Sequence, residues 1–232
     1  MKCVILAGGK GTRLSELTHK VPKPMINICG KPIISHIMLH YAKYGIKEFL
    51  IAAGHKQKII KNYFKKKKIR GLKINIINTG LNTMTGGRLK RLEKYLKDQT
   101  FMMTYGDGIS DVNLKKLLNF HIKHKKISTL TSVRPPARFG AIKLKKNNEV
   151  TYFKEKSKLD SGWINGGFFV FEPEFLNYIK GDQTSLEAEP LTKISKEGLL
   201  GAYKHEKFWQ CMDTMKDKNY LEELWKKKAP WK

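Results

Sequence analysis

The residues with the clearest chemical potential follow a short apolar run near the start of the chain. The sequence Gly-Gly-Lys-Gly-Thr-Arg occupies residues 8–13, directly after the apolar residues 4–7. Glycines let backbone N–H groups approach a phosphate closely, neighbouring N–H groups form an anion site, and Lys10 and Arg13 add positive charge. The segment lacks the third glycine of a dinucleotide-binding fingerprint and the Gly-Lys-Ser/Thr of a Walker A loop. It therefore predicts a phosphate-binding loop of another kind, with a plain tight turn as the alternative.

Two aspartates and a lysine suit the same chemistry. Asp107 stands between glycines after an apolar run, and Asp213 follows another predicted strand and precedes the last predicted helix. Mg²⁺ usually takes one or two protein carboxylates and fills its remaining positions with phosphate and water. Lys23 stands between two prolines, on a stiff segment that can aim its ammonium at the same edge of a sheet. Together these residues indicate Mg²⁺-dependent phosphoryl or nucleotidyl transfer, although a β-turn aspartate is the alternative for Asp107.

The other reactive side chains form no recognisable site. The sequence shows no Ser/His/Asp set and no cysteine beside a base, and we interpret its seven histidines as surface or packing residues. Cys3, Cys29 and Cys211 are too few and too far apart for a disulfide framework, which is typical of a reducing compartment. No apolar run is long enough to span a bilayer, and the first residues make a poor signal peptide. We therefore expect a cytoplasmic protein without membrane insertion.

Alternating strands and helices must position these residues. Apolar periodicity with glycine and proline boundaries predicts strands at 2–7, 48–53, 72–77, 100–104 and 127–133, and helices at 32–44, 55–64 and 114–124. The rhythm then changes, with strands at 139–144, 149–154, 163–171 and 200–204, and helices at 173–179, 187–196 and 216–225. Such alternation predicts an α/β fold, with a mostly parallel sheet between two helical layers. We expect one compact domain whose second half, from about residue 135, is mixed.

The net charge of the chain needs its own interpretation. It is +26, because 46 lysines and arginines stand against 20 acidic residues. A polyanionic partner such as nucleic acid is one explanation. Only six of the basic residues are arginine, however, and arginine is preferred for reading base edges and clamping phosphates. The lysines are also spread over the whole length, so we expect a solvated basic surface and no nucleic-acid partner.

Several stretches resemble one group of enzymes. Residues 6–14 (LAGGKGTRL) and 22–25 (PKPM) are similar to the signatures of the nucleotide-sugar pyrophosphorylases. Longer stretches resemble the glucose-1-phosphate cytidylyltransferases of that superfamily, and they lie at 82–91, 104–108, 138–141, 163–170, 208–214 and 228–231. These stretches span nearly the whole chain. The resemblance implies a Rossmann-like, three-layer nucleotidyltransferase fold with a mixed, mostly parallel central sheet. It also implies one domain over residues 1–232, with a nucleotide-binding half at about 1–134 and a sugar-binding half at about 135–232.

The resemblance also implies a reaction and its residues. A phosphate oxygen of glucose 1-phosphate would attack the α-phosphorus of CTP, with Mg²⁺ as cofactor, to give CDP-glucose and pyrophosphate. Arg13 and Lys23 would be catalytic, and Asp107 and Asp213 would hold the metal. The nucleotide would be bound by Leu6, Ala7, Gly8, Gly9, Lys10, Gly11, Thr12, Arg13, Thr83, Arg88 and Gly106. The sugar phosphate would be bound by Lys156, Asn165 and Gly166.

Some expectations stay open at this point. Ser157 and Cys211 stand where the family usually has proline, which leaves room for a sibling enzyme that uses another sugar phosphate or nucleotide. A non-catalytic nucleotide-binding module is a further alternative. The chain between Phe64 and Leu72 is shorter than is usual for the family, so the implied homo-oligomer is open too. The product would supply deoxysugars for a cell-surface polysaccharide such as a lipopolysaccharide O-antigen.

Overall fold

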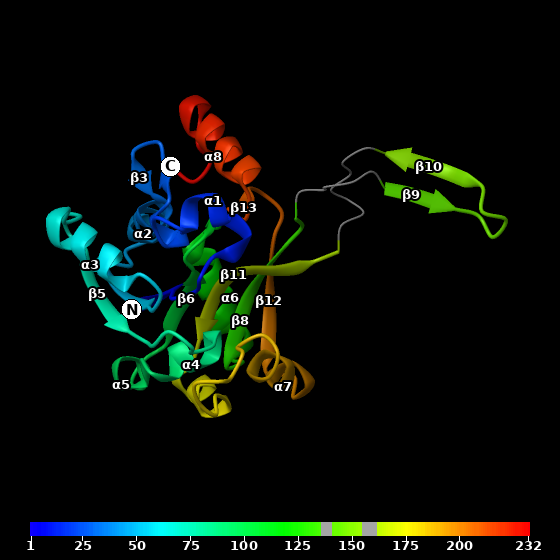
Figure 1. The fold of residues 1–232 in the computed structure, drawn as a ribbon. Helices are drawn as coiled ribbons and strands as arrows, with labels where there is room; N and C mark the ends of the chain where they lie inside the picture. The colour runs from blue at the N-terminus through cyan, green and yellow to red at the C-terminus, as the bar shows by residue number, and fades with distance from the viewer. Residues whose placement is uncertain (136–140, 155–161) are drawn as a thin grey trace.

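The computed structural model describes residues 1–135, 141–154 and 162–232. Seven strands form the central sheet in the order β12-β8-β11-β6-β1-β4-β5 (Figure 1). Their bounds are β1 Lys2–Ala7, β4 Glu48–Ala53, β5 Lys73–Asn78, β6 Phe101–Tyr105, β8 Ser128–Val133, β11 Ile164–Phe171 and β12 Leu200–His205. Neighbours are parallel except at β11, which is antiparallel to both β6 and β8. The predicted mixed, mostly parallel sheet is therefore confirmed.

Strand β1 shows how the sequence builds a core on each side of this sheet. Successive side chains of a strand point to opposite faces. Cys3 and Ile5 accordingly enter one buried apolar cluster, whereas Val4 and Leu6 enter the other. All four side chains are buried. A continuous apolar run is thus what a central parallel strand requires, because both of its faces are covered.

Helices cover both faces and complete three layers. The helices that pack with Cys3 and Ile5 are α2 Ile33–Lys43, α3 Gln57–Lys66, α6 Leu114–His124 and α8 Met215–Lys227. Those that pack on the opposite face are α4 Thr85–Lys90, α5 Glu93–Leu96, the 3-10 helix η4 Pro173–Tyr178, and α7 Pro190–Lys196. Three short helices, η1 Thr12–Leu14, α1 Ser15–Thr18 and η2 Lys23–Met25, follow the glycine segment. Among the described residues, every helix is too short or too polar to cross a bilayer.

Most predicted elements lie where the pattern placed them. The bounds of β1, β4 and α6 agree with the prediction to the residue, and most others differ by one or two. The helix predicted at 187–196 begins only at Pro190, because proline is favoured in the first turn of a helix and lacks the N–H that later turns need. The helix predicted at 173–179 is a single 3-10 segment.

Three small ladders complete the fold. β9 Ala141–Leu144 pairs with β10 Val150–Lys154, in a hairpin that lies apart from the central sheet (Figure 1). β2 Asn27–Ile28 pairs with β3 Lys31–Pro32. β7 Gly108–Ser110 pairs with β13 Trp209–Cys211, and this last ladder joins the two segments that carry the predicted metal ligands. Residues 139 and 140 of the strand predicted at 139–144 lie outside the described residues.

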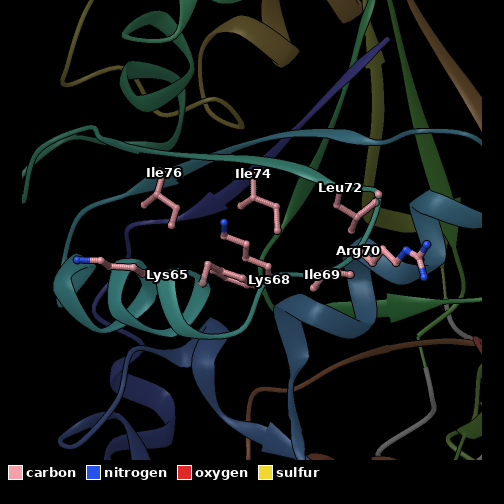
Figure 2. Close-up of a pocket in the computed structure, with 9 residues that line it drawn as sticks. Lys65, Lys68, Ile69, Arg70, Leu72, Ile74 and Ile76 are labelled. Carbon is pink, nitrogen blue, oxygen red and sulfur yellow. The ribbon is translucent and has the colours of Figure 1, made fainter.

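A groove lies along β5, which is one of the two edge strands of the central sheet. Its volume is about 480 Å³, and it lies between the end of α3 and β5 (Figure 2). Apolar side chains such as Ile74 and Ile76 line it, with Lys65 and Lys68 beside them (Figure 2). None of the described residues predicted to bind substrate or metal lines this groove. The site must therefore be sought elsewhere.

Candidate active site

A cleft of about 1560 Å³ gathers most of the predicted site residues. In open α/β sheets, ligands bind beyond the carboxyl ends of the parallel strands, and β1 and β6 both end at this cleft. The predicted residues among those that line it are Leu6, Ala7, Gly8, Gly9, Gly11, Thr12, Arg13, Lys23, Thr83, Arg88, Gly106, Asp107, Asn165 and Asp213. Lys10 and Gly166 are not among the lining residues. Lys156 lies outside the described residues.

The glycine segment is shaped by its close neighbours. A Cβ at Gly8 would lie 2.1 Å from Nη1 of Arg88, which is far inside van der Waals contact. Gly11 has a φ of 68°, in the left-handed region, and a Cβ there would lie 3.1 Å from Cβ of Lys23. A Cβ at Gly9, in contrast, would meet nothing within 4 Å. The loop therefore needs glycine at residues 8 and 11 for the protein's own packing, whereas Gly9 leaves open space.

Arg88 lies beneath the glycine segment and holds a second loop. Its Nη1 donates to Oγ1 of Thr79 at 2.8 Å and to the carbonyl oxygen of Gly80 at 2.7 Å. Only 5% of the residue is exposed, and burial lowers the pKa of its guanidinium, with a smaller contribution from the charge of Arg91. Although Arg88 lines the cleft, most of its hydrogen-bonding capacity is spent on backbone and hydroxyl groups. Its contacts fit a residue that positions the walls of the cleft.

The predicted cation and the two predicted metal ligands meet at one point. Nζ of Lys23 lies 2.7 Å from Oδ2 of Asp107 and 2.5 Å from Oδ1 of Asp213. Nη1 of Arg13 lies 2.9 Å from Oδ2 of Asp213. The sequence separations are 84, 190 and 200 residues. Four side chains chosen from separate motifs thus form one network of charge-assisted hydrogen bonds.

Backbone pairing fixes the two aspartates. The N–H of Gly106 donates to the carbonyl oxygen of Leu6, which ties the end of β6 to the end of β1. The N–H of Met212 donates to the carbonyl oxygen of Asp107 at 2.9 Å, in continuation of the β7–β13 ladder. Carboxylates that are 106 residues apart in the sequence (107 to 213) therefore come to the same place through main-chain hydrogen bonds.

A capping box at the start of α8 fixes Asp213 further. Oγ1 of Thr214 accepts a hydrogen bond from the N–H of Asp217, and Oδ2 of Asp217 accepts one from the N–H of Thr214. The same Oδ2 also accepts from the N–H of Asp213 at 3.0 Å. This arrangement satisfies backbone donors that a helix N-terminus leaves free. It also holds the main chain of Asp213 in place.

The charges of this cluster shift one another's pKa values. Burial alone would lower the pKa of Lys23, but the charges of Asp107 and Asp213 and the hydrogen bonds to them raise it above its ordinary value. Burial would raise the pKa of Asp213, yet Lys23 and the charge of Arg13 hold it below its usual range. Burial and the two aspartates raise the pKa of the Cys211 thiol to about 12. A thiol with so high a pKa is mostly protonated near neutral pH and is a poor nucleophile in that form.

Asp107 and Asp213 have the donor set that magnesium prefers. Mg²⁺ is bound through one or two carboxylates, with phosphate and water as its other ligands. One oxygen of each aspartate faces the same point, which is marked by Nζ of Lys23. Nowhere in residues 1–135, 141–154 and 162–232 do three or more His, Cys, Asp or Glu side chains cluster as a metal site. A pair of carboxylates fits an ion that arrives with a triphosphate.

A second polar group of the cleft was missed from the sequence. The carboxylate of Glu187 accepts hydrogen bonds from the hydroxyls of Tyr105 (2.6 Å), Thr85 (2.7 Å) and Ser185 (3.0 Å). Nδ2 of Asn165 donates to the hydroxyl of Tyr105 at 3.5 Å. Burial, followed by the charge of Glu187, raises the pKa of Tyr105. Tyr105 stands directly before Gly106 and Asp107, which was a usable signal. Glu187 had none, because two of its three partners, Tyr105 and Thr85, are 82 and 102 residues away.

Trp209 also lines the cleft. Its Nε1 donates to the carbonyl oxygen of Gly166 at 2.7 Å, which ties β13 to β11. Oδ1 of Asn165 accepts from the N–H of Gly167 at 2.8 Å, and Gly167 has a φ of 78°. A Cβ at Gly167 would lie 2.4 Å from the ring of Tyr105. The predicted sugar-binding pair, Asn165 and Gly166, is therefore held rigidly by neighbouring groups.

Comparisons with known proteins agree with this geometry. The profile of the family described as "Nucleotidyl transferase" matches residues 2–221. The chain is 46% identical over 255 residues to the glucose-1-phosphate cytidylyltransferase of Salmonella typhimurium, covering 100% of this chain and 99% of that protein. It is 31% identical over 228 residues to the mannose-1-phosphate guanylyltransferase catalytic subunit beta of Xenopus tropicalis, covering 95% of this chain and 63% of that one.

Solved structures share the fold. HddC from Yersinia pseudotuberculosis, complexed with GMP-PN, superposes with a TM-score of 0.78 at 24% identity, covering 97% of this chain and 99% of that one. A putative glucose-1-phosphate thymidylyltransferase from Bacillus anthracis superposes with a TM-score of 0.79 at 18% identity, covering 97% and 94%. The family profile and the full-length relatives lead to one conclusion: this chain belongs to the nucleotidyl transferase family.

Proposed function

We propose that the chain has glucose-1-phosphate cytidylyltransferase activity. It transfers the cytidylyl group of CTP to α-D-glucose 1-phosphate and releases pyrophosphate and CDP-glucose. The observation that carries this proposal is the 46% identity, over the full length of both chains, to the Salmonella typhimurium enzyme of that name. The convergence of Lys23, Asp107 and Asp213 supports an active enzyme over a non-catalytic nucleotide-binding module.

The chain's own groups would act mainly by positioning and by charge. A phosphate oxygen of glucose 1-phosphate attacks the α-phosphorus of CTP, and the bond from that phosphorus to the bridging oxygen of the β-phosphate breaks. The backbone N–H groups of residues 8–13 bind the triphosphate, while Arg13 and Lys23 bind the phosphate oxygens on which charge develops. Asp107 and Asp213 would hold magnesium, which would supply further charge neutralisation at these oxygens.

The remaining assignments follow the two sides of the cleft. We expect Thr83 and Gly106 to contact the nucleotide, with Arg88 holding the loop that follows β5. On the other side, Asn165 would contact the sugar. Gly166, and Lys156 outside the described residues, keep their proposed sugar-phosphate roles. Tyr105 and Glu187 add a hydroxyl and a carboxylate beside Asn165, which are groups suited to sugar hydroxyls.

A sibling activity is the second candidate. Relatives at 31% identity are named for mannose 1-phosphate and guanylyl transfer, so the same fold accommodates another sugar and another base. Cys211 supports this candidate, since it stands where the family usually has proline and its Sγ lies 3.6 Å from Oδ2 of Asp213. A changed residue at that distance can alter which sugar phosphate is accepted.

The cellular setting follows from the same proposal. The three cysteines are all free thiols, which supports a reducing cytoplasm. CDP-glucose made there would serve the synthesis of deoxysugars for a cell-surface polysaccharide, such as a lipopolysaccharide O-antigen.

Pyrophosphate release tests the proposal directly. Purified protein is mixed with Mg²⁺ and glucose 1-phosphate, and CTP, UTP, dTTP, ATP and GTP are compared at equal concentrations. We expect strong preference for CTP, with CDP-glucose as the product in a chromatographic assay. Release with a different nucleotide would favour the sibling activity, which other sugar phosphates then resolve. No release with any nucleotide or sugar phosphate would contradict both candidates.

A further inference from the structure

Lys23 occupies the point at which the two metal carboxylates converge. Its Nζ lies 2.7 Å from Oδ2 of Asp107 and 2.5 Å from Oδ1 of Asp213, and only 12% of its side chain is exposed. Among the described residues it pairs with no other carboxylate. Its backbone is held in the short helix η2, between Pro22 and Pro24. The contact is therefore built into the fold and is not a chance meeting of two mobile side chains.

A magnesium ion at the same carboxylates would need the same space. Mg²⁺ binds carboxylate oxygens at about 2.0–2.1 Å. An ion that contacts one oxygen of Asp107 and one of Asp213 would lie near the present position of the ammonium. A dication and an ammonium in contact repel each other strongly, and a site with little water screens that repulsion poorly. The ammonium therefore competes with the ion for these oxygens.

We propose that Lys23 is an exchangeable occupant of the magnesium position, which it must leave when the metal binds. This inference rests on the proposed roles of Asp107 and Asp213 as metal ligands. The released ammonium stays within reach of the cleft, because its stem is anchored at η2. It becomes free to bind the phosphate oxygens that arrive with the metal.

Arg13 also pairs with a proposed metal ligand and would take part in the same exchange. Its Nη1 lies 2.9 Å from Oδ2 of Asp213, and 77% of its side chain is exposed. Metal binding at Asp213 weakens this contact too. Both cations predicted to act on phosphates are thus paired with metal ligands, so metal and triphosphate favour each other's binding. When the metal binds, the two carboxylates lose their contacts with Lys23 and Arg13 and bind magnesium instead. The two released side chains then bind phosphate oxygens.

The test is metal affinity without nucleotide. Mn²⁺ serves as the probe, and its free concentration is followed by electron paramagnetic resonance at fixed pH. We expect Lys23→Met to bind Mn²⁺ about tenfold more tightly than the wild type, because a competing charge-assisted contact is removed. Lys207→Met is the matched control, since Lys207 lines the same cleft but makes no ion pair with either aspartate in the described part of the chain. It corrects for the loss of one positive charge.

The outcomes separate the exchange from the metal site. Equal or weaker Mn²⁺ binding by Lys23→Met than by the wild type overturns the exchange, while Asp107→Asn still abolishes binding if the metal site is correct. Binding that Asp107→Asn leaves unchanged overturns the metal role, and the exchange falls with it. If Lys207→Met bound Mn²⁺ as tightly as Lys23→Met, the gain in affinity would come from the change in net charge alone. That result would overturn the exchange as well.

A second measurement uses the unmodified protein, in case Lys23→Met does not fold. Acetylation of Lys23 by acetic anhydride is followed by mass spectrometry, with Lys207 as the internal reference. Since Mn²⁺ displaces the ammonium from a protected position, we expect the rate at Lys23 to rise several-fold relative to Lys207. A ratio of rates that saturating Mn²⁺ leaves unchanged, or lowers, overturns the exchange.

Discussion

Asp107 is the residue whose proposed role has the sharpest consequence. Replacing it with asparagine removes a negative charge at the proposed metal and leaves a side chain of nearly the same shape. Charge stabilisation by a metal amounts to several kcal/mol, so we expect Asp107→Asn to lose at least about 10²-fold in kcat/KM. Pyrophosphate release measures this, and circular dichroism checks that the fold is kept. Asp98→Asn, at an exposed aspartate, is the control. Turnover near the wild-type value would contradict the metal role.

The pairing of Lys23 with two carboxylates also makes stability depend on pH. The pKa of Asp213 in the folded protein is lowered from its usual 3.8. The contact between Lys23 and Asp213 therefore stabilises the fold above pH 3.8, and this stabilisation is lost as the pH falls through the folded-state pKa of Asp213. The pKa of Lys23 is raised from 10.5, so at the alkaline end the effect is complete below 10.5 and lost above it.

Lys23→Met should therefore lower the free energy of unfolding only between these acidic and alkaline pH limits. We expect a loss of about 1.5–3 kcal/mol at pH 7, which is typical of hydrogen bonds to charged groups. The difference from the wild type should shrink as the pH falls below 3.8, through the lowered pKa of Asp213. Urea unfolding at several pH values measures it. A difference that is constant across this range would show that Lys23 stabilises by packing alone.

At the scale of elements, the neighbouring residues Gly8 and Gly9 of the glycine segment should tolerate an added Cβ differently. Gly8→Ala places a Cβ 2.1 Å from Nη1 of Arg88, and Arg88 can yield only by giving up its contacts with Thr79 and Gly80. We expect a loss of about 1–3 kcal/mol in the free energy of unfolding. Gly9→Ala meets nothing within 4 Å, so its effect on stability should stay within about 0.5 kcal/mol. Equal losses for both variants would mean that Arg88 does not set the glycine requirement.

The N-terminus of α8 links helix stability to the site. Thr214→Ala removes the hydroxyl of the capping box that precedes the helix, and such caps contribute about 1 kcal/mol. Because the next residue toward the N-terminus is Asp213, we also expect weaker Mn²⁺ binding. Ser195→Ala, at an exposed serine of α7, is the control and should change neither quantity. If Thr214→Ala lowered stability without weakening Mn²⁺ binding, the cap would be structural only.

Elements with a strong local pattern could be predicted from the sequence. β1, β4 and α6 carry continuous or periodic apolar residues with clear boundaries, and their bounds were predicted to the residue. Helix α4 has no such pattern, because it contains Gly86 and Gly87, which are poor helix formers. A Cβ at Gly87 would lie 2.4 Å from the carbonyl oxygen of Asp182. Contact with a distant loop explains these glycines, and no local signal reveals it.

The site was predictable by residue type but not by contact. Glycines, Lys23 and the two aspartates were chosen because each suits phosphate or metal. That Lys23 bridges both aspartates could not be predicted, since the contacts span 84 and 190 residues and depend on the β7–β13 ladder. Glu187 was missed for the same reason, because two of its three hydroxyl partners lie far away in the sequence, in α4 and β6.

At the scale of the whole molecule, the net charge of +26 opposes folding. A high net charge destabilises a compact state through repulsion among its own charges. Several of the ion pairs in the described residues, such as Lys145 with Glu149, lie largely exposed, and exposed pairs contribute little. The cluster of Lys23, Asp107 and Asp213 is an exception, since it lies in the cleft and is partly buried. Repulsion should therefore outweigh attraction over most of the surface.

Salt should accordingly stabilise this protein. The Debye length falls from about 10 Å at 0.1 M salt to about 3 Å at 1 M, which screens long-range repulsion more than close contacts. We expect Tm to rise between about 0.1 M and 1 M NaCl, with chloride chosen because phosphate and sulfate could bind the cleft. Replacing Lys65 and Lys67 by glutamate lowers the formal charge by four, from +26 to +22, at exposed positions, and should reduce the rise. A Tm that falls with NaCl would mean that attractive ion pairs, and not repulsion among lysines, dominate the electrostatic free energy of the fold.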